Sequence, residues 1–312
     1  MATILVLGGS GFVGRHVCAA LAARGLRLRV PTRSRERAKH LTMLPTCETI
    51  AADVHDPAVL KTLLGGCDAV VNLVGVLHGG RGNKGFESAH TGLAQKLVAA
   101  CRETGVRRVL HMSALNAAVD GPSAYLRSKG VAEEIMRGSG LDVTIFRPSV
   151  IFGREDQFLN LFARILKSAP VLIVPMGNAK FQPVHAGDVA QAFVTAYARR
   201  EAIGKTHDLA GPRVWTMREL GDFVARAMGS KKPVFGADST LTHIMAFAME
   251  CLPGKLMSVD NVRSMSVDNV SSAAFPFGIM PQSVEALVPG YVAQASPRGR
   301  YAAYRDRTRR TS

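Results

Sequence analysis

One glycine-rich turn constrains the fold of this chain more than any other feature. The residues read Val6-Leu7-Gly8-Gly9-Ser10-Gly11-Phe12-Val13-Gly14-Arg15, between an apolar run and an amphipathic one. A tight strand-to-helix turn needs glycine at positive φ, and a backbone without Cβ atoms can approach a pyrophosphate. The helix that follows offers free N–H groups to such an anion. We therefore predict a dinucleotide site at Gly8, Gly9, Ser10, Gly11, Phe12, Val13, Gly14 and Arg15, with a purely structural turn as the alternative.

Short apolar runs alternate with helical patterns along the first half of the chain. Strands are expected at residues 3–7, 26–30, 48–52, 69–74, 108–112 and 143–147. Helices are expected from residue 12, where the glycine turn ends, and at 35–44, 57–64, 93–104 and 123–139. Single helices between strands imply right-handed crossovers. The fold class is therefore α/β, a Rossmann-like doubly wound parallel sheet with a smaller C-terminal substrate-binding lobe.

After Pro148 the pattern becomes mostly helical. Helices are expected at residues 158–167, 188–198 with Asp188 as the N-cap, 216–228 and 241–252. We expect a Rossmann domain over residues 1–155, to which the chain returns at about 184–215, and a smaller lobe from 156–183 and 216–297. Residues 298–312 hold six arginines and one acidic residue, which indicates a disordered basic tail.

The composition is that of a globular protein with a strong basic excess. The net charge is +15, which favours anionic ligands or surfaces. The expected partners are a nucleotide and a small or lipid-like substrate, with weak contact between the basic tail and an anionic membrane, and no specific nucleic acid. No apolar run has the ~18–20 residues of a spanning helix, and the N-terminus has no secretory pattern. Five scattered cysteines give no disulfide framework, and no metal site is expected. We expect a cytoplasmic protein, with a peripheral position at the inner membrane as an alternative.

The end of the second expected strand bears on the choice of nucleotide. A site for NAD usually has a carboxylate there, for the ribose 2′-hydroxyl. This chain has Arg33 instead, and Arg15 could reach the same pocket, so NADP(H) is favoured over NAD(H). Asp53, after the third strand, is predicted to accept the adenine amino group, with an ordinary loop aspartate as the alternative.

Tyr125 and Lys129 lie four residues apart, on one face of an expected helix. A lysine near a tyrosine lowers the phenol pKa, and the phenol can then exchange a proton with a substrate oxygen. Ser113 ends the fifth strand and could hold the same oxygen. We therefore predict Tyr125, Lys129 and Ser113 as catalytic residues, with Tyr125 and Lys129 also binding the cofactor.

Together with the glycine turn, these residues resemble the short-chain dehydrogenase/reductase superfamily. The residues Arg147-Pro148-Ser149 and Pro183-Val184-His185-Ala186-Gly187-Asp188-Val189-Ala190 are similar to its extended and atypical branches. The C-terminal Pro281-Gln282-Ser283-Val284-Glu285 and Pro289-Gly290-Tyr291 look like bacterial relatives of the nucleotide-binding accessory subunit of mitochondrial respiratory complex I. The resemblance covers about residues 1–292.

The resemblance implies further cofactor-binding residues and NADPH as the nucleotide. These residues are Val54, Leu73, Val74 and Gly75, together with Pro148, Ser149 and Val150 beside the nicotinamide. Two departures stand out. Ala114 lies where extended enzymes carry a second hydroxyl, and the asparagine of many relatives is missing near residues 89–92.

Two classes of function follow. The favoured one is an NADPH-dependent enzyme of the oxidoreductase, epimerase or dehydratase type that acts on a small or lipid-like substrate. The alternative is a non-catalytic NADPH-binding module with a structural or assembly role near respiratory complex I or quinone synthesis. Tyr125 and Lys129 favour the enzyme, and Ala114 favours the module.

Overall fold

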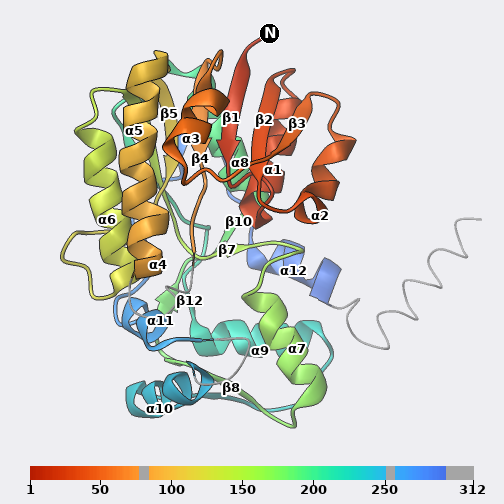
Figure 1. Ribbon diagram of the computed structural model, residues 1–312. Helices are drawn as coiled ribbons and strands as arrows, with labels where there is room; N and C mark the ends of the chain where they lie inside the picture. The colour runs from red at the N-terminus through yellow and green to blue at the C-terminus, as the bar shows by residue number, and fades with distance from the viewer. Residues whose placement is uncertain (77–83, 251–256, 293–312) are drawn as a thin grey trace, which may run out of the picture. The chain divides into compact units, whose positions relative to one another are not determined.

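A computed structural model describes residues 1–76, 84–250 and 257–292 (Figure 1). The chain divides into two compact units. The first unit consists of Met1–Pro148, Ala186–Leu209 and Ser271–Met280. The remaining described residues form the second unit. The predicted tail at 298–312 lies outside the described residues, and the domain bounds given in the sequence analysis stay a prediction.

A seven-stranded parallel sheet forms the centre of the first unit. Its order is β11-β6-β5-β4-β1-β2-β3, which confirms the predicted doubly wound class. The strands are β1 (Thr3–Leu7), β2 (Arg27–Thr32), β3 (Cys47–Ala51), β4 (Ala69–Asn72), β5 (Arg108–Met112), β6 (Asp142–Pro148) and β11 (Thr206–Leu209). Strands β1 and β4 are fully or nearly fully buried, as expected where helices cover both faces of a sheet.

Helices cover the sheet on both faces (Figure 1). On one face, α3, α5 and α6 enclose a core of Leu, Val and Ala side chains with the strands, and on the other α1 packs against α8. The helices are α1 (Phe12–Ala22), α2 (Arg35–Ala38), the 3₁₀ helix η1 (Lys39–Met43), α3 (Pro57–Leu64), α4 (Lys84–Phe86), the π-helix η2 (Glu87–Gly92), α5 (Leu93–Thr104), α6 (Ala124–Arg137), α8 (Ala186–Ala198) and the 3₁₀ turns η3 (Arg200–Ala202) and η4 (Pro276–Gly278).

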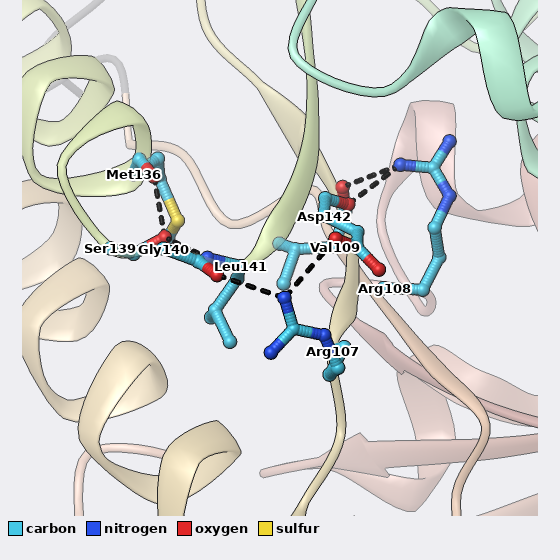
Figure 2. A network of polar contacts seen from close by, with 8 residues as sticks. All are labelled: Arg107, Arg108, Val109, Met136, Ser139, Gly140, Leu141 and Asp142. Carbon is cyan, nitrogen blue, oxygen red and sulfur yellow. Dashed lines mark hydrogen bonds and ion pairs between the residues drawn. The ribbon is translucent and has the colours of Figure 1, made fainter.

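Two arginines fix the start of β6 against β5 (Figure 2). Arg108 donates to the carbonyl oxygens of Asp142 at 2.8 Å and Ala196 at 2.8 Å. Arg107 donates to the carbonyl oxygen of Gly140 at 3.2 Å and to the Asp142 carboxylate at 3.4 Å. These bonds connect the start of β5 to the loop before β6, to the first residue of β6 and to α8.

The second unit is mainly helical. Leu and Val of α7 and α9 pack with Phe152, Phe181 and Trp215 in one apolar core. Its elements are β7 (Ile151–Phe152), α7 (Leu159–Ser168), β8 (Leu172–Val174), β9 (Lys180–Phe181), β10 (Val184–His185), β12 (Trp215–Thr216), α9 (Met217–Ala227), β13 (Val234–Gly236), α10 (Ser239–Glu250), α11 (Val259–Ser264) and α12 (Val284–Val292).

Two predicted helices need correction. The helix expected at 35–44 is a short α2 followed by η1, because Pro45 disfavours helical backbone at Leu44 and Thr42 Oγ1 donates to the Lys39 carbonyl. Asp188 is not an N-cap, since α8 already begins at Ala186. Asp188 lies in the first turn instead, where a negative charge interacts favourably with the helix dipole.

Candidate functional site

The site lies where the carboxyl ends of the parallel strands of the first unit meet. From β4 the strand order runs through β5 to β6, and from β1 it runs through β2 to β3, so the order reverses between β1 and β4. Ligands of open α/β sheets bind at such a switch point. Gly8 and Leu73 follow β1 and β4, and a Cβ on Gly8 would lie 3.0 Å from the Leu73 carbonyl carbon. Two predicted nucleotide-binding segments therefore meet here.

The glycine turn has the backbone geometry that a pyrophosphate needs. Gly8 has a φ of 78°, which favours glycine. A Cβ on Gly14 would overlap the Gly8 carbonyl oxygen, so this residue packs the start of α1 onto the turn. Gly11 has an ordinary φ of −82° and is exposed, and no side chain caps the helix at this residue. The cradle at Gly11 therefore fits a dinucleotide, with the N–H groups of Phe12 and Val13 in the first turn of α1.

We expect Gly11→Val to weaken NADPH binding about 10- to 100-fold while the protein stays folded. A branched side chain would occupy the space that the phosphates need, whereas the nearest atom of the protein, the Gly8 carbonyl oxygen, lies 3.2 Å from the position that a Cβ on Gly11 would take. Fluorescence titration with NADPH measures the affinity, and circular dichroism follows folding. Gly290→Ala, at a position with no atom within 4 Å, is the control. Unchanged affinity in Gly11→Val would remove the turn from the site.

The residues after β2 and β3 are exposed at the same edge. Arg33 is exposed, and the turn that carries it is held by Thr32, whose Oγ1 accepts from the Ser34 N–H at 3.2 Å. Asp53 is exposed too, and one of its oxygens accepts from the His55 N–H at 3.0 Å. Val54 packs against the core. The Asp53 carboxylate thus has a structural bond and keeps a second oxygen for a ligand.

Helix α6 presents the predicted Tyr125 and Lys129. The Ser123 side chain caps it by accepting from the Leu126 N–H at 3.1 Å. Lys129 is 2% exposed, and its Nζ donates to the carbonyl oxygens of Met112 at 3.0 Å and Val74 at 3.4 Å. Burial lowers the Lys129 pKa to about 8, against a smaller opposite effect of Glu133. The ammonium group therefore lies at the ends of β4 and β5.

A hydrogen-bonded chain that the sequence analysis missed supports Tyr125. His90 Nε2 accepts from the Val76 N–H at 3.2 Å, which leaves the proton on Nδ1, 2.8 Å from Ser128 Oγ. Ser128 Oγ in turn donates to the Tyr125 carbonyl oxygen at 2.8 Å. The rings of His90 and Phe86 both pack edge-on against the Tyr125 ring. His90 therefore fixes both the backbone after Gly75 and the start of α6.

The π-helix η2 places His90 within this chain, which no spacing rule for α-helices would reveal. A Cβ on Gly75 would lie 3.4 Å from Lys129 Nζ and 3.8 Å from His90 Nε2. His90 and Lys129 therefore face the same position, which is also that of the predicted cofactor-binding Gly75.

The phenol pKa differs from the sequence-based expectation. Burial raises the pKa of Tyr125 to about 12, whereas proximity to a lysine was expected to lower it. The physical reason is that the Tyr125 ring packs against Phe86 and His90, while the Lys129 ammonium is directed at backbone carbonyls. Tyr125 is therefore protonated at neutral pH.

Ser113 is 2% exposed, and its Oγ has no hydrogen-bond partner among the described residues. Its backbone N–H donates to the Phe146 carbonyl oxygen at 2.7 Å, which continues the sheet beyond β5. The adjacent Ala114 is also buried. Since Lys129 Nζ donates to the carbonyl oxygen of Met112, the residue before Ser113, the predicted Ser113 and Lys129 lie at the same strand end.

Two residues of α6 that were not predicted hold it in place. A Cβ on Gly130 would overlap the backbone of Ala118, so glycine allows the helix to approach that loop. Glu133 is 0% exposed and accepts from Arg147 Nε at 2.8 Å and Nη2 at 2.7 Å, and also from Arg137. The Glu133–Arg147 pair ties α6 to the end of β6. A Gly directly after the predicted Lys129 was the only sequence signal for either contact.

The three residues predicted beside the nicotinamide are divided between the units. Pro148 ends β6 in the first unit, and its carbonyl oxygen accepts from the Leu115 N–H at 3.0 Å. Ser149 and Val150 belong to the second unit. There the Asn269 side-chain oxygen accepts from Ser149 Oγ at 2.6 Å and from the Val150 N–H at 3.2 Å.

We expect the protein to lose stability as the pH falls below about 6.5. Burial, with a smaller effect of Lys129, lowers the pKa of His90 to about 2 and of His111 to about 3, from 6.5. The unfolded chain binds these two protons below pH 6.5 and the folded chain does not. The free energy of unfolding then falls by about 1.4 kcal/mol per pH unit for each histidine.

Urea unfolding between about pH 7 and pH 5 measures this dependence. In His90→Gln, the change in the free energy of unfolding per pH unit should be smaller by the contribution of one histidine. The control is His243→Gln, at an exposed histidine of α10, which should leave this change as in the wild type. A wild-type protein equally stable at both pH values would contradict the burial of neutral histidines.

Within the described ranges, no group of three His, Cys, Asp or Glu side chains is placed to hold a metal ion. Among the described helices, none has the length and apolar character needed to cross a membrane.

The described geometry is that of a Rossmann-type dinucleotide-binding protein, and solved structures with this fold are similar to the chain. A dTDP-glucose 4,6-dehydratase from Streptomyces venezuelae with NAD and TYD bound has a TM-score of 0.74 at 21% identity, over 95% of this chain and 98% of that one. A protein named MoeE5, in complex with UDP-glucose and NAD, has a TM-score of 0.65 at 21% identity, over 76% and 85%.

Residues 4–210 match the NAD dependent epimerase/dehydratase family, and the chain belongs to this family. The subunit 9 of the NADH dehydrogenase [ubiquinone] 1 alpha subcomplex from Arabidopsis thaliana mitochondria is 34% identical over 70% of this chain. That from Mus musculus is 33% identical over 70%. The matched region spans 56% and 59% of these relatives' own lengths. A ceramide reductase from Caulobacter vibrioides is 30% identical over 73% of this chain and 71% of its own.

Proposed function

We propose that the protein is an NADPH-dependent oxidoreductase that reduces a carbonyl group of a small, lipid-like substrate. The observation that carries this proposal is the hydrogen bond from Lys129 Nζ to the carbonyl oxygen of Met112, directly before Ser113, with Tyr125 one helical turn from Lys129 on α6. The predicted nucleotide-binding Gly75 adjoins the same lysine. These contacts support a single site that combines a proton donor with the predicted nucleotide-binding edge.

The bound dinucleotide would supply the hydride. Tyr125, whose phenol is protonated at neutral pH, donates a proton to the substrate oxygen, which is the direction that reduction requires. Ser113 Oγ, without a partner among the described residues, holds that oxygen. Lys129 supports the nicotinamide ribose and stays charged below about pH 8.

A lipid-like substrate is supported by the relative named as a ceramide reductase, which matches over 71% of its own length. We infer that the substrate of this chain carries a carbonyl group next to an apolar chain. The test is NADPH oxidation, followed by absorbance, with long-chain ketones, short-chain ketones and quinones. Turnover confined to the long-chain ketones supports the substrate class, and turnover with only the quinones or short ketones rejects it.

We expect NADPH to bind about 10- to 150-fold more tightly than NADH, and Arg33→Ala to remove most of this difference. Arg33 is exposed after β2, where no carboxylate would repel a 2′-phosphate, and a charge-assisted hydrogen bond contributes ~1.5–3 kcal/mol. Titration of both nucleotides into wild type, Arg33→Ala and the control Arg35→Ala measures the preference. Equal affinities in the wild type would show that the site prefers neither nucleotide.

A second candidate is a non-catalytic NADPH-binding module with an assembly role. It is favoured by Ala114, beside Ser113, and by the relatives named as subunits of NADH dehydrogenase. Such a module would bind NADPH tightly and gain stability of RT ln(1 + [L]/Kd) from it, without oxidising it. Tight binding with no turnover on any carbonyl would therefore favour the module over the enzyme.

A further inference from the structure

Helix α10 in the second unit is apolar on two sides. Met245, Ala246 and Met249 pack against Met257 and Val262 in a small core. On the other side Leu241, Ile244 and Phe247 are 45%, 62% and 68% exposed. A helix that is apolar all round is normally covered on every side. The outer side of α10 is therefore an apolar face without a partner in the described structure.

The neighbouring strand pair extends this apolar character. In the two-stranded sheet, Phe235 of β13 is the register partner of Ile173 of β8, and the two are 54% and 40% exposed. Only Gly236, Ala237 and Asp238 separate β13's Phe235 from the first residue of α10. We call Ile173, Phe235, Leu241, Ile244 and Phe247 the apolar face of the second unit. Five large exposed side chains on two paired strands and the helix that follows one of them exceed the scattered apolar residues of an ordinary surface.

Lysines gather where β13 begins. Lys232 Nζ donates to the carbonyl oxygen of Leu166 at 2.7 Å, which brings the start of β13 to the end of α7. Lys167, the next residue of α7, and Lys231 are both exposed. Between β13 and α10, the carboxylate of Asp238 accepts from the Leu241 N–H at 2.8 Å. Three lysine side chains thus lie at the border of the apolar face, near the start of β13.

We propose that the apolar face of the second unit docks on an anionic lipid bilayer, with Lys167, Lys231 and Lys232 on the headgroups. Amphipathic surfaces with large apolar side chains and lysines at the rim bind in the interfacial region of such membranes. A second copy is a poorer occupant, because two chains of net charge +15 repel each other while an anionic bilayer attracts each. Docking does not depend on the proposed reductase activity, but it would bring the protein to a lipid-like substrate.

Co-sedimentation of the full-length protein with vesicles tests the proposal. The vesicles contain phosphatidylcholine alone or with one third phosphatidylglycerol. We expect wild type to bind the anionic vesicles at least about tenfold more tightly than the neutral ones, and less tightly at high salt. I244D/F247D should weaken this binding at least about tenfold, and K167E/K231E should weaken it and reduce its salt dependence. Met43→Asp, at an exposed position of the first unit, is the control and should bind as wild type does.

Three further measurements decide the outcome. The circular dichroism spectrum must stay unchanged in every variant, which shows that each is folded without relying on the proposed reaction. A chain that ends at residue 297 should still bind the vesicles. Loss of binding in that chain but not in I244D/F247D would assign the contact to the tail and overturn the proposal. Wild type that forms dimers by analytical ultracentrifugation, with I244D/F247D monomeric, would assign the face to a second copy and also overturn it.

Discussion

Tyr125→Phe is expected to lower the rate of carbonyl reduction about 10²- to 10⁴-fold while NADPH affinity changes little. The substitution removes the one proton that the phenol would transfer. The ring keeps its edge-on packing with Phe86 and His90, whose centroids lie 6.0 Å and 5.7 Å away. Stopped-flow absorbance under single-turnover conditions measures the rate, and fluorescence titration measures the affinity.

Two variants make this result specific. Tyr197→Phe, which removes the hydroxyl of a half-buried tyrosine on α8, should reduce substrate at the wild-type rate. Lys129→Ala should lower both the rate and the NADPH affinity, because the ammonium group lies beside Gly75, a predicted cofactor-binding residue. If Tyr125→Phe turns over as fast as wild type, Tyr125 is not the proton donor.

Glu133→Ala is expected to lower the free energy of unfolding by about 3 kcal/mol. Glu133 is fully buried and pairs with Arg147 through both carboxylate oxygens. Its removal leaves Arg147 without its ion-pair partner, and breaking a buried pair costs about 3–5 kcal/mol. The lower end applies here, because the Arg147 side chain is 29% exposed and water replaces part of the lost contact. Urea denaturation measures the change.

Glu134→Ala is the matched control, because Glu134 is the next residue of α6, has the same side chain and is exposed. It should change the free energy of unfolding by less than about 0.5 kcal/mol. Glu133→Gln should fall between the two, because an amide of the same shape keeps some of the hydrogen bonds. Equal stability of Glu133→Ala and Glu134→Ala would show that the pair contributes nothing to folding.

The sequence predicted the sheet because periodicity and glycine act locally. Strands β1 to β6 and the turn at Gly8 each follow from a few adjacent residues. It did not predict β11, because Thr206, His207 and Asp208 lack the apolar run of a buried parallel strand. That strand pairs with β6 at an edge of the sheet, where polar side chains are tolerated.

Site residues could be predicted where the spacing of a motif identifies them. Residues whose role depends on a contact between distant segments could not. Tyr125, Lys129 and the glycine turn follow from spacing along one element. His90 contacts Ser128 across 38 residues, and Glu133 contacts Arg147 across 14, and no local pattern marks either pair. The expected phenol pKa was wrong for the same reason, since it depended on which groups enclose Tyr125 rather than on the four-residue spacing.

Strand β11 lies far beyond β6 in the sequence, and this order affects how the chain folds during its synthesis. This strand comes from Thr206–Leu209, so the outer edge of β6 stays unpaired until the ribosome has made 58 residues beyond position 148. Most buried residues of β6 are apolar, and an open strand edge is the part of a nascent chain most prone to pair with another. We therefore expect a nascent chain to be most prone to wrong strand pairing between the emergence of β6 and that of β11.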